Sequence, residues 1–339
     1  MKRAGLVYFA GFTIISLGLL TGCSGSSNAA NTSAGSNASG SGVKIGGVVQ
    51  NASDPFFVTL MCGASKEAEA EGATMTWKPT NSTSIQELQA NLDAVSLTNP
   101  GGILMSGSGD SSYNTKIQSL QQTGTPVVVV NVPVIPPVEY AQITSSSDNT
   151  DFAHYVAKDI GHGGELGILG GIAGAKIFTS RYQPVIDALG KVAPDVKVLP
   201  VQYDDVDRTK AASVASALIV AHPDLKAIYA VSGPEGAGAA AAVKQAGKAD
   251  KVKVYTYDAT PEVVQGLQEG TISAALAQSA YRIGQEGVKA ILDYRKANPG
   301  TTPVMPDASK NQTIPLKILT KENVNDADSK AFQYVSTCN

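Results

Sequence analysis

Residues Val43 to Ala70 read VKIGGVVQNASDPFFVTLMCGASKEAEA, and the rest of the chain is organised around this stretch. Its first part, Val43 to Val49, is an apolar run typical of a buried strand. A polar loop follows with two adjacent aromatic residues, Phe56 and Phe57. Pro55 stands where the first turn of a helix tolerates a missing N–H group. The stretch therefore predicts a strand, a polar loop and a helix as the first unit of an α/β fold.

The same alternation continues to residue 319 in two runs of similar design. Apolar periodicity predicts strands at residues 73–77, 102–105, 125–131, 141–144, 166–169, 196–202, 225–231, 252–257, 272–277 and 313–319. Helical patterns lie between them, and such alternation implies parallel sheets. The proline-rich segment 132–137 can neither continue a helix nor pair inside a sheet, so it predicts a domain edge. Two facing copies would bring both sets of strand carboxyl ends to one crevice, where open α/β sheets bind ligands.

Composition and charge narrow the class of protein. The chain has 339 residues, of which 43% are hydrophobic, enough for two domains of ordinary size. It carries 26 Lys and Arg against 29 Asp and Glu, so no basic surface for nucleic acid is expected. A small neutral or weakly charged ligand fits this balance.

The N-terminus has the pattern of an export signal. Basic residues at positions 2 and 3 precede a mostly apolar run from Ala4 to Leu20, and Leu20-Thr21-Gly22-Cys23 resembles the lipobox of bacterial lipoproteins. We therefore predict a signal peptide at 1–22, lipidation of Cys23 and an anchor on the outer face of the cell membrane. Residues 23–42 would form a flexible tether because they are small and polar. The alternative is an uncleaved transmembrane anchor.

Two further cysteines, Cys62 and Cys338, form an even pair if Cys23 is lipidated. In an exported protein they could form a disulfide that ties the C-terminal tail to the first helix. The alternative is a buried Cys62 and a free Cys338.

Patterns for catalysis and cofactors fail in this sequence. Leu169 stands where a dinucleotide fingerprint ending at Gly174 needs glycine, and no serine has glycine two residues before and after it. His154, His162 and His222 show no metal-ligand spacing. We expect neither an enzyme, a metal site nor a cofactor.

Six motifs in order resemble the ribose-type sugar-binding proteins of bacterial ABC importers. They are Asp54-Pro55-Phe56-Phe57-Val58, Gly171-Ile172-Ala173-Gly174 with Arg181, Asp205-Val206-Asp207-Arg208, Ala221-His222-Pro223-Asp224, Tyr257-Asp258-Ala259-Thr260-Pro261 and Ala277-Gln278. The resemblance covers nearly all of Val43 to Leu319. It implies the type I periplasmic binding protein fold, with two doubly wound parallel-sheet α/β lobes joined by a three-segment hinge.

The resemblance also places the hinge and the lobes. The crossings would lie near Ser147, Gln278 and Ile314. The N-terminal lobe would comprise residues 43–146 and 279–314, and the C-terminal lobe and tail residues 147–278 and 315–339. The lactose-repressor family shares this core, but an export leader in place of a DNA-binding helix-turn-helix argues against regulation.

Carried over position by position, the resemblance implies nine ligand-binding residues. Their carboxylate, guanidinium and amide groups suit paired sugar hydroxyls, and their aromatic faces suit C–H surface. They are Asp54, Phe56, Phe57, Asn131, Arg181, Ser232, Tyr257, Asp258 and Gln278. In the alternative interpretation Phe56 and Phe57 are core residues, and Arg181 and Asp258 form a salt bridge between the lobes.

Three positions depart from the ribose pattern. Asn131-Val132 replaces an Asp-Arg pair, Val206 replaces a stacking aromatic residue, and Ser232 replaces Asn. These changes predict a sugar alcohol or a monosaccharide other than ribose, with Tyr203 as a substitute aromatic.

Together these features predict a monomeric, membrane-tethered receptor. It would bind a sugar or polyol and deliver it to an ABC permease with a cytoplasmic ATPase. The alternatives are a receptor for a small diffusible, autoinducer-like signal and an enzyme acting on a small carbohydrate.

Overall fold

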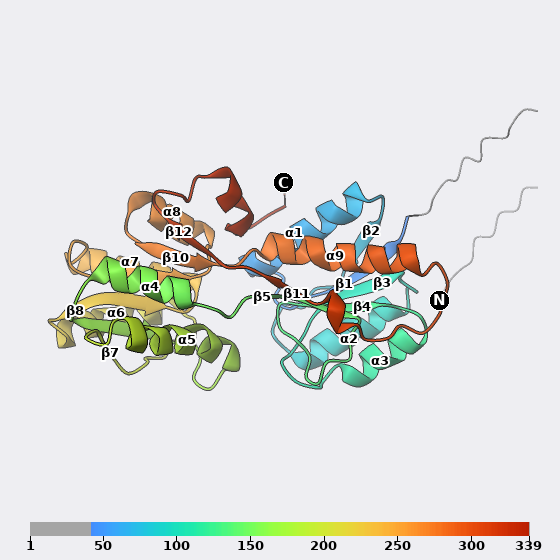
Figure 1. The fold of residues 1–339 in the computed structure, drawn as a ribbon, viewed down its shortest axis with the longest axis horizontal. Coiled ribbons are helices and arrows are strands. Elements are labelled where there is room, and N and C mark those ends of the chain that lie inside the picture. The colour runs from blue at the N-terminus through green and yellow to red at the C-terminus, as the bar shows by residue number, and fades with distance from the viewer. Residues whose placement is uncertain (1–41, 339) are drawn as a thin grey trace, which may run out of the picture. The chain divides into compact units, whose positions relative to one another are not determined.

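The computed structural model describes residues 42–338 (Figure 1). The predicted signal peptide, Cys23 and nearly all of the predicted tether lie outside these residues. Among the helices of residues 42–338, none combines the length and the apolar character that a membrane crossing requires.

The first lobe is built on a parallel sheet with the strand order β11-β5-β4-β3-β1-β2. Its strands are β1 (Lys44–Val48), β2 (Thr74–Trp77), β3 (Gly102–Ser106), β4 (Val127–Val130), β5 (Ala141–Ser145) and β11 (Gln312–Ile314). Its helices are α1 (Pro55–Ala70), α2 (Ile85–Ser96), α3 (Asn114–Gln122) and α9 (Ala280–Ala297). Figure 1 shows α1 and α9 on one side of this sheet and α2 and α3 on the other.

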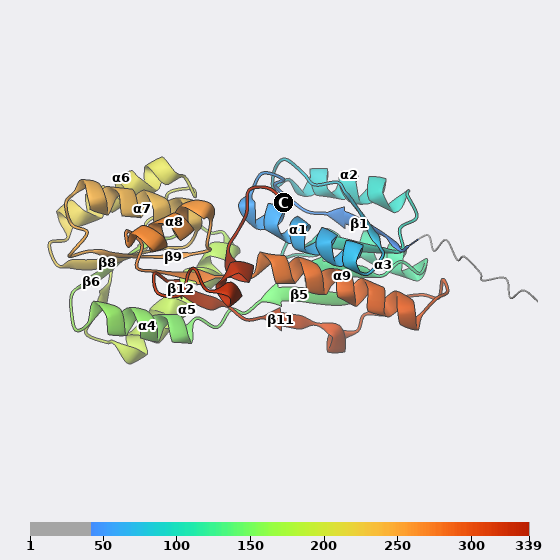
Figure 2. The same cartoon turned by 90° about the horizontal axis from the view of Figure 1, so that it is seen from above.

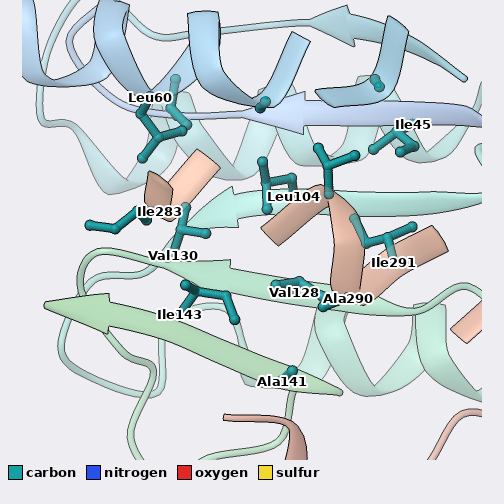
Figure 3. Close-up of a cluster of buried hydrophobic side chains, with 14 of the residues drawn as sticks. Ile45, Leu60, Leu104, Val128, Val130, Ala141, Ile143, Ile283, Ala290 and Ile291 are labelled. Carbon is teal, nitrogen blue, oxygen red and sulfur yellow. The ribbon is translucent and has the colours of Figure 1, made fainter. Parts of the chain in front are cut away.

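Strand β4 shows why helices cover both faces of the first sheet. Its sequence is an unbroken run of four valines, and all four side chains are buried. Val128 and Val130 pack under α1 and α9 in the cluster drawn in Figure 3, while Val127 and Val129 pack against α2 and α3. A strand that is apolar on both faces needs cover on both, as parallel sheets do.

The second lobe has the same plan, with the strand order β12-β10-β9-β8-β6-β7. Its strands are β6 (Glu165–Leu169), β7 (Lys197–Val198), β8 (Leu225–Ala230), β9 (Lys253–Tyr257), β10 (Ala274–Ala277) and β12 (Lys317–Thr320). Helices α6 (Arg208–Ala221), α7 (Gly233–Gln245) and α8 (Pro261–Glu269) cover one face, and α4 (Thr150–Ile160) and α5 (Lys176–Val192) the other (Figure 2). Strand β12 runs antiparallel to β10. The predicted pair of parallel-sheet α/β lobes is confirmed.

Three segments join the sheets within the described chain. The chain leaves the first sheet after β5, returns from β10 to α9, and leaves again between β11 and β12. Both lobes are therefore discontinuous in sequence.

Two expectations about strands and edges are wrong. The predicted strand at 313–319 is two short strands, β11 beside β5 and β12 beside β10, with Pro315 between them. Proline has no N–H for a sheet ladder, so the chain can change sheets there.

The proline-rich segment 132–137 is not a domain edge. It joins β4 to β5, which are neighbours in one sheet. The segment is tied to the same lobe, since Ile135 donates its amide to the Asp110 carbonyl at 2.9 Å and the Asn114 side chain donates to the Pro136 carbonyl at 2.9 Å. A segment that pairs with no strand can still be a loop inside a domain.

The C-terminal segment connects the lobes once more. A short 3₁₀ helix, η2 (Ala327–Phe332), packs on the second lobe through Phe332. Six residues later, Cys338 forms a disulfide with Cys62 of α1 in the first lobe. The structure therefore joins the two cysteines that the sequence left as a pair.

Candidate functional site

Four of the nine predicted binding residues stand just after the carboxyl end of a strand. Asn131 follows β4, Asp258 follows β9 and Gln278 follows β10. Ser232 comes two residues after β8 and directly before α7. Because the carboxyl ends of parallel strands in one sheet meet at the same edge, the three residues of the second lobe gather there.

Asp258 is the centre of this cluster. Arg181 donates from Nη1 to Asp258 Oδ2 at 2.9 Å, and Gln278 donates from Nε2 to Asp258 Oδ1 at 2.9 Å. The same Arg181 nitrogen donates to the carbonyl of Val231 at 2.9 Å. The side chains of Arg181 and Asp258 are only 13% and 11% exposed, so this ion pair is largely withdrawn from water.

The ion pair lies inside one lobe. Asp258 follows β9, and Arg181 belongs to α5, well inside the helix rather than at a strand end. Both elements pack in the second lobe, so the alternative of a salt bridge between the lobes is wrong.

An aromatic ring supports the guanidinium. The Cζ of Arg181 lies 4.3 Å from the centroid of the Tyr257 ring, within the range of a cation–π contact. Burial raises the pKa of Tyr257 to about 12, so its hydroxyl stays protonated at neutral pH. The planar guanidinium is thus fixed by a ring and by two oxygen acceptors.

Asp54 reaches the site from the first lobe. It caps the N-terminus of α1, where its Oδ1 accepts from the Phe56 amide at 2.9 Å. Its pKa is above the ordinary value mainly because of burial, and Asp258 raises it further. The Phe56 hydrogen bond and the charge of Arg181 lower this pKa. Asp54 therefore lies within electrostatic reach of both members of the ion pair.

Phe56 and Phe57 belong to the buried core of the first lobe. Their rings meet edge to face with centroids 5.1 Å apart. The Phe56 ring also meets the ring of Tyr334, at 5.6 Å between centroids. Both phenylalanines are thus core residues, and Phe56 additionally borders the group that contacts Asp258.

The structure describes the surroundings of three further polar residues named in the prediction. Ser232 donates its hydroxyl to Glu235 Oε2, so this hydroxyl already has a buried partner. Asn131 is half-buried and has a φ of 65°, a left-handed conformation that asparagine tolerates. Tyr203 is 45% exposed and neighbours Tyr182.

Tyr334 is the residue that the sequence reasoning missed. Its hydroxyl donates to Asp258 Oδ1 at 2.6 Å, and its amide donates to the Ala259 carbonyl at 2.9 Å. The ring is buried, with 4% of its surface exposed. The signal that could have found it is an aromatic residue four positions before Cys338, because a disulfide from Cys338 to the first helix draws this tail across the site.

Two α/β lobes on mainly parallel sheets, joined by three segments and carrying charged, amide and aromatic groups after the strands, define a type I periplasmic binding protein. The chain belongs to the periplasmic binding protein family, because the family model described as "periplasmic binding protein domain" matches residues 45–299. The resemblance identified from the six motifs is thereby confirmed.

Individual relatives agree with this assignment. The ribose import binding protein of Salmonella typhimurium is 30% identical over 244 residues, which cover 71% of this chain and 81% of the relative. The D-allose-binding periplasmic protein of Escherichia coli is 34% identical over 146 residues, which cover 43% of this chain and 47% of the relative. A sugar-binding protein of a sugar ABC transporter from Bacillus halodurans has the same fold, with a TM-score of 0.74 at 19% identity over 83% of this chain and 99% of that one.

Proposed function

We propose that this protein is the substrate-binding component of a bacterial ABC importer for a monosaccharide or a sugar alcohol. The observation that carries the proposal is the buried cluster of Arg181, Asp258 and Gln278, with Tyr257 beneath the guanidinium. The named relatives that import ribose or bind allose support the same class of ligand.

The cluster has hydrogen-bonding capacity to spare for a polyhydroxylated ligand. An arginine side chain carries five N–H donors, and a carboxylate offers about four acceptor positions. Within residues 42–338, the hydrogen bonds of the Arg181 side chain leave from Nη1, so Nε and Nη2 can serve ligand hydroxyls. Asp258 accepts three hydrogen bonds and can take another. Adjacent ligand hydroxyls would pair with both residues.

The remaining predicted residues fill out the proposed site. Asp54 offers a carboxylate from the first lobe, Phe56 an apolar edge, and Tyr257 a protonated hydroxyl and a ring. Asn131 follows a strand end of the first lobe, Phe57 supports the Phe56 ring from the core, and Ser232 contributes through its hydrogen bond to Glu235. We infer that the ligand binds residues of both lobes and so draws the lobes together. It can contact both sets of residues at once only in the closed arrangement.

The ligand is inferred to differ from ribose. Val206 stands where the ribose-type proteins usually have a stacking aromatic residue. Tyr203 is exposed, and the ring that contacts Arg181 is that of Tyr257. A ligand held less by two-sided stacking and more by hydroxyl contacts fits a sugar alcohol or another monosaccharide.

Export and delivery complete the proposal. The leader ending at Cys23 supports a lipid anchor on the outer face of the membrane, and residues 24–42 would let the folded body reach a permease. The permease and its cytoplasmic ATPase are the partners, and the receptor acts as a monomer. The lobes would be 43–146 with 279–314, and 147–278 with 315–339.

The test is a thermal-shift screen of the mature protein over D-ribose, D-allose, D-fructose, xylitol and an autoinducer furanone, followed by titration calorimetry. A true ligand at 100 times its Kd stabilises the folded state by about 2.7 kcal/mol. We expect a sugar or polyol to raise the melting temperature and to be recovered unchanged. Stabilisation by the furanone alone, or conversion of a hit into product, would overturn the proposal.

Arg181→Ala is the sharpest variant. It removes a charge-assisted contact from a site with little water, so sugar affinity should fall at least about 100-fold. The matched control is Arg208→Ala at the exposed start of α6, which should bind like the wild type. Unchanged affinity in Arg181→Ala, with the fold intact, would remove Arg181 from the site.

A further inference from the structure

The C-terminal tail, residues 327–338, passes from one lobe to the other beside the cluster of Arg181, Asp258 and Gln278. On the second lobe it is held by Phe332, which packs in the core. At the crossing from β10 to α9, the Ser279 hydroxyl donates to the Ala331 carbonyl at 2.6 Å. On the first lobe, the Val335 amide donates to Thr59 Oγ1 at 2.8 Å. The chain therefore changes lobes between residues 332 and 335, and Tyr334 lies at the crossing.

Tyr334 touches site residues of both lobes. Its hydroxyl bonds Asp258 of the second lobe, and its ring packs edge to face on Phe56 of the first, at an interplanar angle of 80°. Core packing alone would not need the hydroxyl, because a phenylalanine would fill the same space. The hydroxyl instead donates a hydrogen bond to the Asp258 carboxylate at the centre of the proposed site.

The geometry of Asp258 shows what that hydroxyl does. A separation of 2.6 Å falls in the range of charge-assisted O–H···O⁻ bonds, which are about twice as strong as neutral ones. Arg181 holds Oδ2, while Gln278 and Tyr334 both hold Oδ1. With three donors the carboxylate can neither rotate nor shift freely, so the direction of its remaining lone pairs is set before a ligand arrives.

The tail depends on its disulfide to keep Tyr334 there. Residues 335–338 are all exposed, so burial contributes little to holding this last segment in place. The bond from Cys338 to Cys62 closes the tail onto α1, the helix whose first turn carries Phe56. Without it, residues 335–338 would fray and Tyr334 would have one fewer restraint.

We propose that Tyr334 is a positioning residue of the sugar site, which orients the Asp258 carboxylate and is held in place by the Cys62–Cys338 disulfide. The inference rests on the proposed function, since it concerns the same cluster. On this inference the C-terminal tail is part of the binding site. Sugar affinity then depends on whether Cys62 and Cys338 are oxidised to the disulfide or reduced.

The test is a double-mutant cycle on the full mature chain. Four proteins are compared: the wild type, Tyr334→Phe, Cys62→Ala with Cys338→Ala, and the triple variant. Affinity is measured by calorimetry for D-ribose, D-allose, xylitol and D-glucose, the C3 epimer of D-allose. The apo melting temperature reports folding.

We expect Tyr334→Phe to weaken binding about tenfold, because one hydrogen bond to a charged group is lost. Removal of the disulfide should weaken binding several-fold, and should cost little more once Tyr334 is Phe, since both changes act through one side chain. The ratio of affinities for D-allose and D-glucose should also change, whereas mere loosening of the fold would weaken both sugars equally.

The control is Thr59→Val, which removes the acceptor of the Val335 amide on α1 without touching Asp258. It should bind sugar within about twofold of the wild type. Mild reduction of the wild-type protein repeats the disulfide arm without any substitution, in case the alanine variants fold poorly.

Three results would count against the inference: unchanged affinity in Tyr334→Phe, additive losses in the cycle, or an unchanged allose-to-glucose ratio. A wild type that binds none of the four compounds, nor any other member of the thermal-shift panel, would instead overturn the proposed function. The two failures are therefore distinct.

Discussion

Asp258 receives hydrogen bonds from three side chains that lie 77, 20 and 76 residues away in the sequence. Two of these donors, Arg181 and Gln278, stand in motifs that the sequence analysis selected, whereas Tyr334 stands in none. Periodicity and motif position identify residues at strand ends, but they carry no information about which distant side chain completes a hydrogen bond. Two of the three donors to Asp258 were thus predictable from the sequence, and the third was not.

Glu235 is a second residue whose role depends on its surroundings. It is fully buried, accepts from the Gly171 amide at 2.9 Å and is paired with the Ser232 hydroxyl. Burial, followed by the neighbouring Asp204 carboxyl, raises the pKa of Glu235 to about 9. At neutral pH this side chain therefore carries a proton inside the folded protein.

This pKa predicts a pH dependence of stability. Folded Glu235 keeps its proton up to about pH 9, whereas the unfolded chain releases it near the ordinary value of 4.5. The folded state then binds more protons, so the stability that this group contributes is complete below about pH 4.5 and is lost as pH rises towards 9. Glu235→Gln, which cannot ionise, should flatten the fall in unfolding free energy across this window.

Urea denaturation of wild type and Glu235→Gln at several pH values between 4.5 and 9 checks this prediction. Glu262→Gln, a surface carboxylate in the first turn of α8, is the control and should run parallel to the wild type. Parallel curves for Glu235→Gln as well would show that Glu235 is ionised in the folded state.

Helices α1 and α9 of the first lobe pack with their backbones close together. A Cβ added at Gly284 of α9 would overlap the Leu60 carbonyl of α1, and one at Gly63 of α1 would overlap the Tyr281 carbonyl of α9. The absence of side chains at these two positions brings the helices together. This contact holds α1, and with it Asp54, Phe56 and Cys62, against the sheet.

Gly284→Ala should therefore destabilise the first lobe. Overpacking against backbone atoms costs about 1–3 kcal/mol of unfolding free energy. Gly190→Ala in α5 is a matched control, because its added Cβ meets open space and alanine is the better helix former by about 1 kcal/mol. Equal stability of the two variants in thermal or urea unfolding would contradict the proposed close packing.

The predicted helices and strands were correct in most places, and two expectations about strands and edges were wrong. The helices and most strands followed from apolar periodicity because each buries one face or two. The prediction of one strand at residues 313–319 was wrong because a run of seven mostly strand-forming residues has the same pattern whether it pairs with one sheet or with two. The proline-rich loop failed because inability to pair in a sheet does not mark the end of a lobe.

At the scale of the whole molecule, the disulfide links residues 276 positions apart and closes nearly the entire described chain into a loop. In the chain-entropy account, a cross-link over so long a loop stabilises the folded state by about 5 kcal/mol. Reduction should lower the melting temperature of the sugar-free protein by several degrees. A melting temperature that is the same with and without reductant would show that the disulfide contributes nothing to global stability.

Apolar periodicity was enough to predict an α/β protein of two similar halves, and the order of the motifs placed the chain in its family. Both follow from local information: the period of apolar residues, the turn residues between elements, and short motifs at strand ends. Three features became visible only in the folded chain: the last predicted strand is two strands in two sheets, Arg181 pairs with Asp258 inside one lobe, and Tyr334 is the third donor to Asp258. These outcomes depend on contacts between residues far apart in the chain, whose proximity exists only after the sheets, the hinge segments and the disulfide have brought them together.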